Sequence, residues 1–394
     1  MAANALSRRS GAQNLQSGSL WRAFPQGLVA KIDGILSVKC ETKPSIAIAG
    51  GGLMGRLLAW RLSLQDFDIS LYEAGDLSTP SGACWAAAGM ISPLSELVHS
   101  EREIYVLGVQ SLELWPGWAE QLEAQSGRSV QFRSLGSVLV AHGQDKSELL
   151  QFQRELRGKL NGDISACVQP LGADELRQLE PALENFEQGL YLRGEGDINN
   201  RRLLPILLNV LRQQGVSLKE RTPVSCHGYQ LEHAEGRARF DCVIDCRGLG
   251  AREQIQGLRG VRGEVLVVQT REVALQRPVR LLHPRYKLYA VPRGDGHTVI
   301  GATEIESEDM SPISVRSTME LSSALYSLHP AFAEARIVET RVNCRPATMD
   351  NLPYVHCEPG LVRVNGLHRH GYLLAPALVA NIEKLVTEQV LQVA

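Results

Sequence analysis

Hydrophobic and polar positions between residues 45 and 73 follow the order strand, helix, strand. A short apolar run predicts a buried strand at Ile46–Ala49, and helical spacing predicts a helix at Leu53–Leu64. A second apolar run predicts a strand at Ile69–Tyr72. This order is typical of a βαβ unit with parallel strands.

The remaining chain continues this mixture of helical and strand-like patterns. Helical spacing recurs at Tyr105–Ala124, Glu148–Leu160, Arg201–Gln214, Val315–Leu328 and Tyr372–Leu391. Strand-like runs lie at Ser137–Ala141, Gly189–Leu192, Cys242–Asp245, Glu264–Gln269, Leu288–Val291 and Thr298–Ile300.

The order of these elements predicts an α/β fold in which a second domain is inserted into a Rossmann-like first domain. The second domain is expected to hold an antiparallel sheet with a helix. We expect residues 1–44 to form a flexible N-terminal extension, with an organellar transit peptide as the alternative. The first domain is assigned to residues 45–125, 200–262 and 340–394, and the second to residues 126–199 and 263–339.

The charge balance narrows the function classes. The chain of 394 residues carries 41 basic and 43 acidic side chains, for a formal net charge of -2. A dedicated nucleic-acid binder normally shows a strongly basic face, so we expect no nucleic-acid partner. No apolar run approaches the ~20 residues that a membrane-spanning helix needs. The cysteines are scattered without a CxxC pair, which indicates reduced thiols and a cytoplasmic location.

A glycine-rich turn follows the first predicted strand. Gly50 permits the tight turn, Gly52 lets a pyrophosphate approach the backbone, and Gly55 lets helix and strand pack closely. Glu73 ends the second strand, where this fingerprint places a carboxylate for a ribose hydroxyl. An acid there disfavours NADP, but the motif does not separate FAD from NAD. A glycine turn without a nucleotide is the structural alternative.

A run of small residues at Ser81–Pro93 follows Glu73. Small side chains let a backbone lie against a flat ring, with its N–H groups facing ring heteroatoms. A tightly packed helix start explains the same composition. The run alone leaves both interpretations open.

Together these motifs resemble the D-amino-acid oxidase superfamily of flavoproteins, and within it the glycine oxidases of thiamine biosynthesis. The similarity extends from about Ser45 to the end of the chain. It rests on Gly50–Gly55 with Glu73, Ala86–Met90, Lys287–Arg293 with Ile300–Thr303, and Cys344–Asp350 with Asn365–Pro376.

The resemblance implies FAD bound in a glutathione-reductase-type domain. The pyrophosphate is expected at the glycine turn, the ribose at Glu73, the isoalloxazine ring at the small-residue run and the adenine at a backbone group of Val224. The loop before the last helix is expected to close over the pyrimidine edge. The implied FAD-binding residues are Gly50, Gly52, Leu53, Met54, Gly55, Glu73, Ala88, Gly89, Met90, Val224, Leu367, His368, Arg369, His370, Gly371, Tyr372 and Leu373.

The resemblance also implies a substrate site. Arg345 is expected to pair with a substrate carboxylate, Tyr289 to hydrogen-bond the substrate, and Arg369 to lie near it. Lys287 and His370 depart from the family pattern of His and Asn, and we hypothesise that Lys287 shifts substrate preference. A surface charge is the alternative for Arg345, and a cross-strand packing pair is the alternative for Lys287 with Tyr289.

The implied reaction is hydride transfer from the substrate α-carbon to flavin N5, with O2 reduced to hydrogen peroxide. The product imine is expected to pass to a thiazole synthase, and the chain is compatible with a homo-oligomer. The alternatives are a dehydrogenase that uses a quinone or carrier protein, a sarcosine-type or D-amino-acid oxidase, and a non-catalytic flavin protein. His368 and His370 lack a third ligand nearby in the sequence, so no metal site is predicted.

Overall fold

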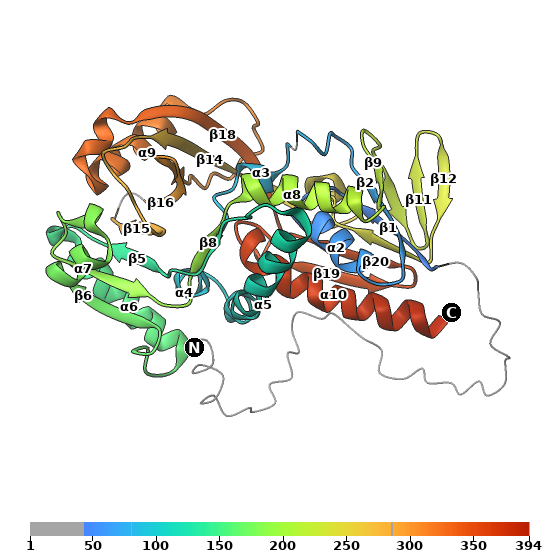
Figure 1. The fold of residues 1–394 in the computed structure, drawn as a ribbon, viewed down its shortest axis with the longest axis horizontal. Helices are drawn as coiled ribbons and strands as arrows, with labels where there is room; N and C mark the ends of the chain where they lie inside the picture. Colours follow the sequence, from blue (N-terminus) through green and yellow to red (C-terminus); the bar gives the residue numbers. More distant parts are fainter. Residues whose placement is uncertain (1–42, 80, 285–286, 394) are drawn as a thin grey trace.

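The computed structural model describes residues 43–79, 81–284 and 287–393, so nearly all of the predicted N-terminal extension lies outside the described residues. Within these ranges two large β-sheets with packed helices make up the molecule, in agreement with the predicted α/β class (Figure 1). Strands β11 (Gln230–His233) and β12 (Gly236–Arg239) lie toward one end of the view, and helix α9 (Val315–Leu328) lies toward the other (Figure 1).

The first sheet has six strands and holds the predicted βαβ unit. All neighbouring pairs are parallel except the edge pair at the C-terminal end of the chain. The strand order is β19 (Tyr354–Glu358), β20 (Leu361–Asn365), β13 (Cys242–Asp245), β1 (Ser45–Ala49), β2 (Asp68–Tyr72) and β9 (Ser217–Lys219).

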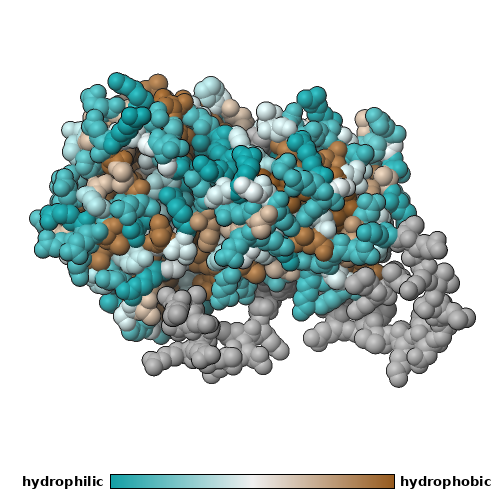
Figure 2. All heavy atoms as spheres, in the orientation of Figure 1, coloured by the Kyte–Doolittle hydropathy of each residue, from teal (hydrophilic) through white to brown (hydrophobic). Residues whose placement is uncertain are grey.

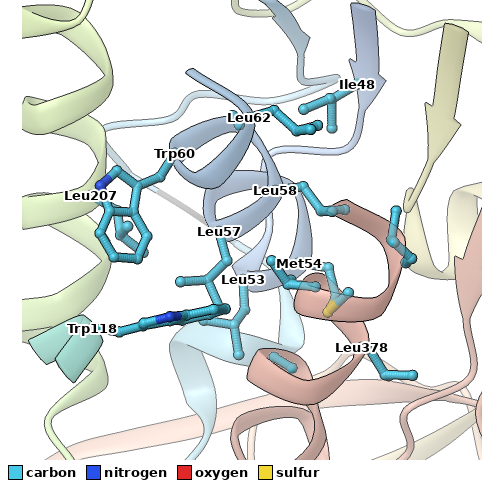
Figure 3. Packing of buried hydrophobic residues seen from close by; sticks show 14 of the residues in the cluster. Ile48, Leu53, Met54, Leu57, Leu58, Trp60, Leu62, Trp118, Leu207 and Leu378 are labelled. Atoms are coloured by element: carbon cyan, nitrogen blue, oxygen red, sulfur yellow. The ribbon is translucent and has the colours of Figure 1, made fainter. Parts of the chain in front are cut away.

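Helices cover one face of this sheet and form the largest core cluster. Trp60 is fully buried and meets Trp118 edge to face with ring centroids 5.6 Å apart. Leu207 lies beside Trp60, and Leu378 belongs to the same cluster (Figure 3). Burying each such side chain contributes roughly 1.5–3 kcal/mol. The helices are α2 (Leu53–Ser63), α5 (Arg102–Ser126), α8 (Asn200–Gln213) and α10 (Gly371–Val393).

The other face of the first sheet is covered by a three-stranded antiparallel sheet. Cys226 and Leu231 of this small sheet pack against Ala47, Tyr72 and Val243 of the large one. Its strands are β10 (Ser225–His227), β11 (Gln230–His233) and β12 (Gly236–Arg239).

The second sheet has eight strands, all paired antiparallel except β15 with β5. Val138 faces α7 and α9 while its neighbour Leu139 faces α6, as the alternation of side chains along a strand requires. The strand order is β18 (Arg336–Ala347), β14 (Arg259–Gln269), β17 (His297–Gly301), β16 (Lys287–Gly294), β15 (Val279–Leu282), β5 (Ser137–Val140), β7 (Gln188–Leu192) and β6 (Val168–Gly172). The covering helices are α6 (Lys146–Leu160), α7 (Ala173–Leu179) and α9 (Val315–Leu328).

Short elements connect the two large sheets. A three-stranded sheet is formed by β3 (Met90–Ile91), β8 (Gly196–Ile198) and β4 (Phe132–Arg133). The short helices are α3 (Ala83–Ala86), α4 (Pro93–Leu97), η1 (Gly143–Asp145), η2 (Pro181–Leu183), η3 (Gly248–Ala251) and η4 (Pro330–Glu334).

The predicted domain boundaries at 262/263 and 339/340 fall inside β14 and β18, which run without interruption across them. The division into two domains therefore stays a prediction. Figure 2 shows a face on which hydrophilic residues predominate and hydrophobic ones are scattered. Among the described residues, no helix combines the length and the apolar character that crossing a bilayer requires.

Candidate functional site

A cavity of about 1460 Å3 is lined by residues of both large sheets. Cavities that hold drug-sized ligands commonly measure about 300–1,000 Å3. The space is therefore large enough for a dinucleotide together with a small second molecule.

The glycine turn forms one wall of this cavity. Gly50 has a φ of +105°, and a Cβ on Gly55 would lie 1.8 Å from the Gly50 carbonyl oxygen. No side chain caps α2 at Gly52, so the N–H groups of its first turn, at Leu53 and Met54, lack intrahelical acceptors. Such N–H groups and the positive end of the helix dipole suit a pyrophosphate.

Glu73 lies at the end of β2 and also lines the cavity. Its carboxylate accepts hydrogen bonds from the backbone N–H of Gly51 at 2.6 Å and of Gly75 at 2.9 Å. These bonds hold the acid beside the glycine turn, at the place expected for a ribose contact.

Arg56 is a buried arginine in α2 that the sequence analysis did not single out. Its guanidinium donates to the carbonyl groups of Gly51, Leu77 and Leu204 at 2.6–2.8 Å. Burial lowers the pKa of Arg56 from its ordinary 12.5, and no carboxylate among the described residues forms an ion pair with it. A positive charge placed behind the glycine turn and hydrogen-bonded to carbonyl groups suits an anionic pyrophosphate.

The small-residue segment forms a second wall. Gly89 has a φ of +63°, and a Cβ there would lie 2.1 Å from the Ile198 carbonyl oxygen, so β3 can approach β8 only through glycine. The side chain of Arg293 donates to the Ala88 carbonyl group. Ala88, Gly89 and Met90 all line the cavity, and the small Ala88 and Gly89 leave room for a flat ring.

The loop before α10 closes a third side. The N–H of His368 donates to the Pro346 carbonyl at 2.9 Å, and Leu367 forms a β-bridge with Ala347. The hydroxyl of Tyr372 donates to the Cys84 carbonyl at 2.8 Å, which ties the loop to the small-residue segment. The predicted loop residues all line the cavity: Leu367, His368, Arg369, His370, Gly371, Tyr372 and Leu373.

Arg345 and Tyr289 come from separate strands and line the same part of the cavity. The Arg345 guanidinium donates to the carbonyl groups of Thr303 at 3.1 Å and Arg262 at 3.4 Å. Burial raises the pKa of Tyr289 from 10.0, although the charge of Arg345 opposes this shift, so the phenol keeps its proton. The pair offers a cation and a neutral hydroxyl group to a ligand.

Arg369, by contrast, is already neutralised. Its Nε lies 2.9 Å from Glu96 Oε2 and its Nη1 lies 3.0 Å from Glu304 Oε2. Glu96 also pairs with Arg280 at 2.8 Å and contacts His370 Nε2 at 2.9 Å. We refer to Glu96, Arg280, Glu304 and Arg369 as the charged cluster.

The charged cluster lines the same cavity as Arg345 and Tyr289, and the sequence analysis identified only Arg369 of it. Burial opposes ionisation of Glu96, but the charges of Arg280 and Arg369 outweigh it and hold the pKa of Glu96 well below 4.5. Burial lowers the pKa of His368 from 6.5 to about 3, so this imidazole is neutral.

Ser92 supplies a free hydrogen-bonding group to the cavity wall. It is 2% exposed, and its hydroxyl oxygen has no hydrogen-bond partner. Buried hydroxyl groups are normally satisfied, so this one is available to a ligand or a water molecule in the cavity.

Two predicted site residues, Gly55 and Val224, do not line the cavity, and the side chain of a third is not described. Gly55 packs behind the turn against Gly50, and Val224 lies outside the wall with its carbonyl accepting a hydrogen bond from Arg247 at 2.6 Å. Lys287 opens β16, and its side chain lies outside the described part of the chain. Their roles remain predictions. Across the described ranges no group of three or more His, Cys, Asp or Glu residues is arranged to hold a metal ion.

Comparison with known proteins gives consistent matches. The profile of the FAD dependent oxidoreductase family matches residues 45–382. A Rhizobium etli protein assigned to thiamine biosynthesis as the oxidoreductase ThiO is 39% identical over 347 residues, covering 87% of this chain and 97% of that protein.

Two further relatives extend the comparison. The glycine oxidase of Geobacillus kaustophilus is 28% identical over 84% of this chain and 89% of its own sequence. Its crystal structure superimposes with a TM-score of 0.75, covering 89% of this chain and 95% of that one. The bifunctional protein ThiO/ThiG of Trichormus variabilis is 27% identical over 87% of this chain, which spans 53% of that longer protein.

Proposed function

Because this chain belongs to the FAD dependent oxidoreductase family, we propose that it oxidises glycine or another small amino acid or amine, with O2 as the electron acceptor. The predicted family, fold class, cofactor FAD and assignment as an oxidoreductase are confirmed by the family match and the relatives. The identity of the substrate and of the electron acceptor goes beyond this and is the proposal.

One observation carries the proposal: Arg345, which forms no ion pair with any described residue, presents its guanidinium to the same cavity as the glycine turn. A planar guanidinium pairs with a carboxylate through two charge-assisted hydrogen bonds. An amino acid held in this way presents its amine and α-carbon to the remaining cavity walls.

The side chains around Arg345 orient the substrate and keep its surroundings neutral. Tyr289 keeps its proton and can donate a hydrogen bond to the substrate carboxylate. Ser92 offers a further hydroxyl group. When bound, FAD supplies a two-electron acceptor for a hydride from the substrate α-carbon. No side-chain base is required if the substrate amine enters as the free base.

The substrate amine loses two electrons and two protons overall and becomes an imine. One O2 takes up the same two electrons and two protons and becomes hydrogen peroxide. The fused relative from Trichormus variabilis supports transfer of the product to a second activity, which we propose to be a thiazole synthase. The free cysteines of the described residues support a reducing, cytoplasmic location.

The test uses the purified, flavin-loaded protein. Anaerobic glycine, sarcosine or D-alanine should bleach the flavin absorbance, and mixing with O2 should restore it with one peroxide per turnover. Replacing Arg345 by Met should raise the KM by about 100-fold or more, since two charge-assisted bonds are lost, while flavin content stays normal. A protein that holds no flavin, or one that no amine reduces, would contradict the proposal. Slow reoxidation by O2 would instead identify a dehydrogenase with another acceptor.

A further inference from the structure

The substrate side of the cavity contains more positive side chains than one carboxylate needs. Arg345, Arg280 and Arg369 all line it. Arg280 lies directly opposite Tyr289 in the β15–β16 ladder, so the two side chains share one face of the sheet. A ligand held by Arg345 and Tyr289 therefore lies within the field of further guanidinium groups.

Two carboxylates form ion pairs with the additional arginines. Glu96 uses one oxygen for Arg280, at 2.8 Å, and the other for Arg369, at 2.9 Å. Glu304 binds the Nη1 of Arg369 at 3.0 Å. Among the described residues, Arg280 and Arg369 each form an ion pair with these carboxylates, whereas Arg345 forms none.

We propose that Glu96 and Glu304 make this cavity selective for substrates with one carboxylate group. They form ion pairs with Arg280 and Arg369, whose guanidinium groups would otherwise be available to a second acidic group such as that of an aminodicarboxylic acid. This inference rests on the proposed function, because it assumes that Arg345 binds the first carboxylate.

The burial of these groups gives the arrangement its strength. The side chain of Glu96 is 12% exposed, and those of Arg280 and Arg369 are 19% and 25% exposed. An ion pair that is largely removed from water is screened far less than one on the surface. A dicarboxylate that displaces Glu96 leaves a buried carboxylate without its partners, which opposes its binding.

The experiment compares the affinities of a monocarboxylate and a dicarboxylate that are not oxidised. Glycolate and malonate are titrated into the flavin-loaded protein, and Kd values are measured by calorimetry and from flavin absorbance. The wild type should bind glycolate at least about tenfold more tightly than malonate. Arg345 can form charge-assisted hydrogen bonds with one carboxylate, whereas the second carboxylate of malonate finds no free arginine.

The variants then remove the negative charge without changing side-chain shape. Glu96→Gln should tighten malonate binding by about tenfold relative to glycolate, because Arg280 and Arg369 regain free donors. Glu304→Gln should shift the ratio of malonate to glycolate affinity in the same direction by a smaller factor. Because the Glu304 side chain is 43% exposed, its replacement should disturb folding less, so this variant tests the inference independently. The double variant Glu96→Gln, Arg369→Gln should lose part of the gain in malonate affinity that Glu96→Gln alone produces.

Glu101→Gln is the matched control, since Glu101 is an exposed residue that lines the cavity and forms no ion pair with the charged cluster. It removes an equal charge and should leave the glycolate-to-malonate ratio within about twofold, as expected for a screened surface charge. Equal binding of both ligands to the wild type, no change in either variant, or an equal change in the control overturns the inference. If glycolate binds poorly and Arg345→Met makes no difference, the proposed function itself fails.

Discussion

The guanidinium of Arg345 lies across the backbone of Gly263, on the neighbouring strand β14: a Cβ at Gly263 would be 2.3 Å from Arg345 Nη2. Tyr289 has the same relationship to Gly301 on β17, where a Cβ would be 2.7 Å from the phenol oxygen. Strands β14 and β17 lie between β18 and β16 in the sheet. The two glycines therefore let side chains from the flanking strands reach inward over the sheet toward each other.

Gly263→Ala should displace Arg345 without unfolding the sheet, because the added methyl group meets the far end of a flexible side chain. We expect the KM for glycine to rise by about tenfold or more through loss of one charge-assisted bond, with normal flavin content. Steady-state kinetics and the flavin spectrum measure both effects. An unchanged KM would separate Arg345 from substrate binding.

Arg56→Met should weaken FAD binding. The substitution removes a buried charge and leaves the carbonyl groups of Gly51, Leu77 and Leu204 without their donor. We expect the Kd of FAD for the apoprotein to rise by about tenfold or more. Arg61→Met on the same helix is the control, since Arg61 pairs with Glu383 and is partly exposed. Equal losses in both variants would argue against a specific role for Arg56.

Ser92→Ala should affect ligand binding more than folding. The Ser92 hydroxyl has no protein partner, so its removal should change the thermal midpoint by less than about 2 °C while the KM rises several-fold. Ser95→Ala is a contrasting variant, because the buried Ser95 hydroxyl donates to Glu195 at 3.1 Å. That variant should lose stability and keep its KM. The reverse pattern would remove Ser92 from the site.

His368 should make the stability of the protein depend on pH. Its folded pKa is about 3 against an ordinary 6.5, so below pH 6.5 the unfolded chain binds a proton that the folded chain does not. The free energy of unfolding is therefore highest, as far as His368 is concerned, above pH 6.5. It decreases as the pH falls toward 3, by roughly 2 kcal/mol at pH 5.

His368→Asn removes this titration and suits the backbone, since asparagine tolerates the φ of +48° at this position. Urea unfolding at pH 7 and pH 5 should show a smaller loss of stability in the variant than in the wild type. Parallel losses in both proteins would show that His368 does not titrate as described.

Local periodicity was enough to predict most elements that position the cofactor. The helix predicted at Val315–Leu328 has those bounds in the structure, and the first strand and helix differ from the prediction by one residue at an end. These segments have a single buried face or a continuous apolar run. Their sequence period therefore reports their structure directly.

Strand β18 was missed because its pattern is not apolar. Glu339, Arg341 and Arg345 interrupt the alternation, and the first residues of the strand are exposed. Its length comes from pairing with β14 along the whole of Arg259–Gln269. Such a contact between distant segments leaves no local signal.

The difference between local motifs and contacts of distant segments also explains which site residues could be predicted from the sequence. The glycine turn is a local motif, and Arg345 was found only because its surroundings resemble a known family. Glu96 has no recognisable motif, since its partners Arg280 and Arg369 are brought to it by the fold. Charged clusters assembled from distant segments remain hidden until the chain is folded.

The cavity walls come from the beginning, middle and end of the chain: the turn after β1, the strand β16, and the loop that leads into α10. A ligand bound there contacts segments that are far apart in the sequence and so links them. Since a ligand that binds only the folded chain adds to its stability by mass action, the supply of flavin should set how long each copy resists unfolding and proteolysis. In riboflavin-poor cells, we expect the abundance of this protein to fall before its catalytic constants change.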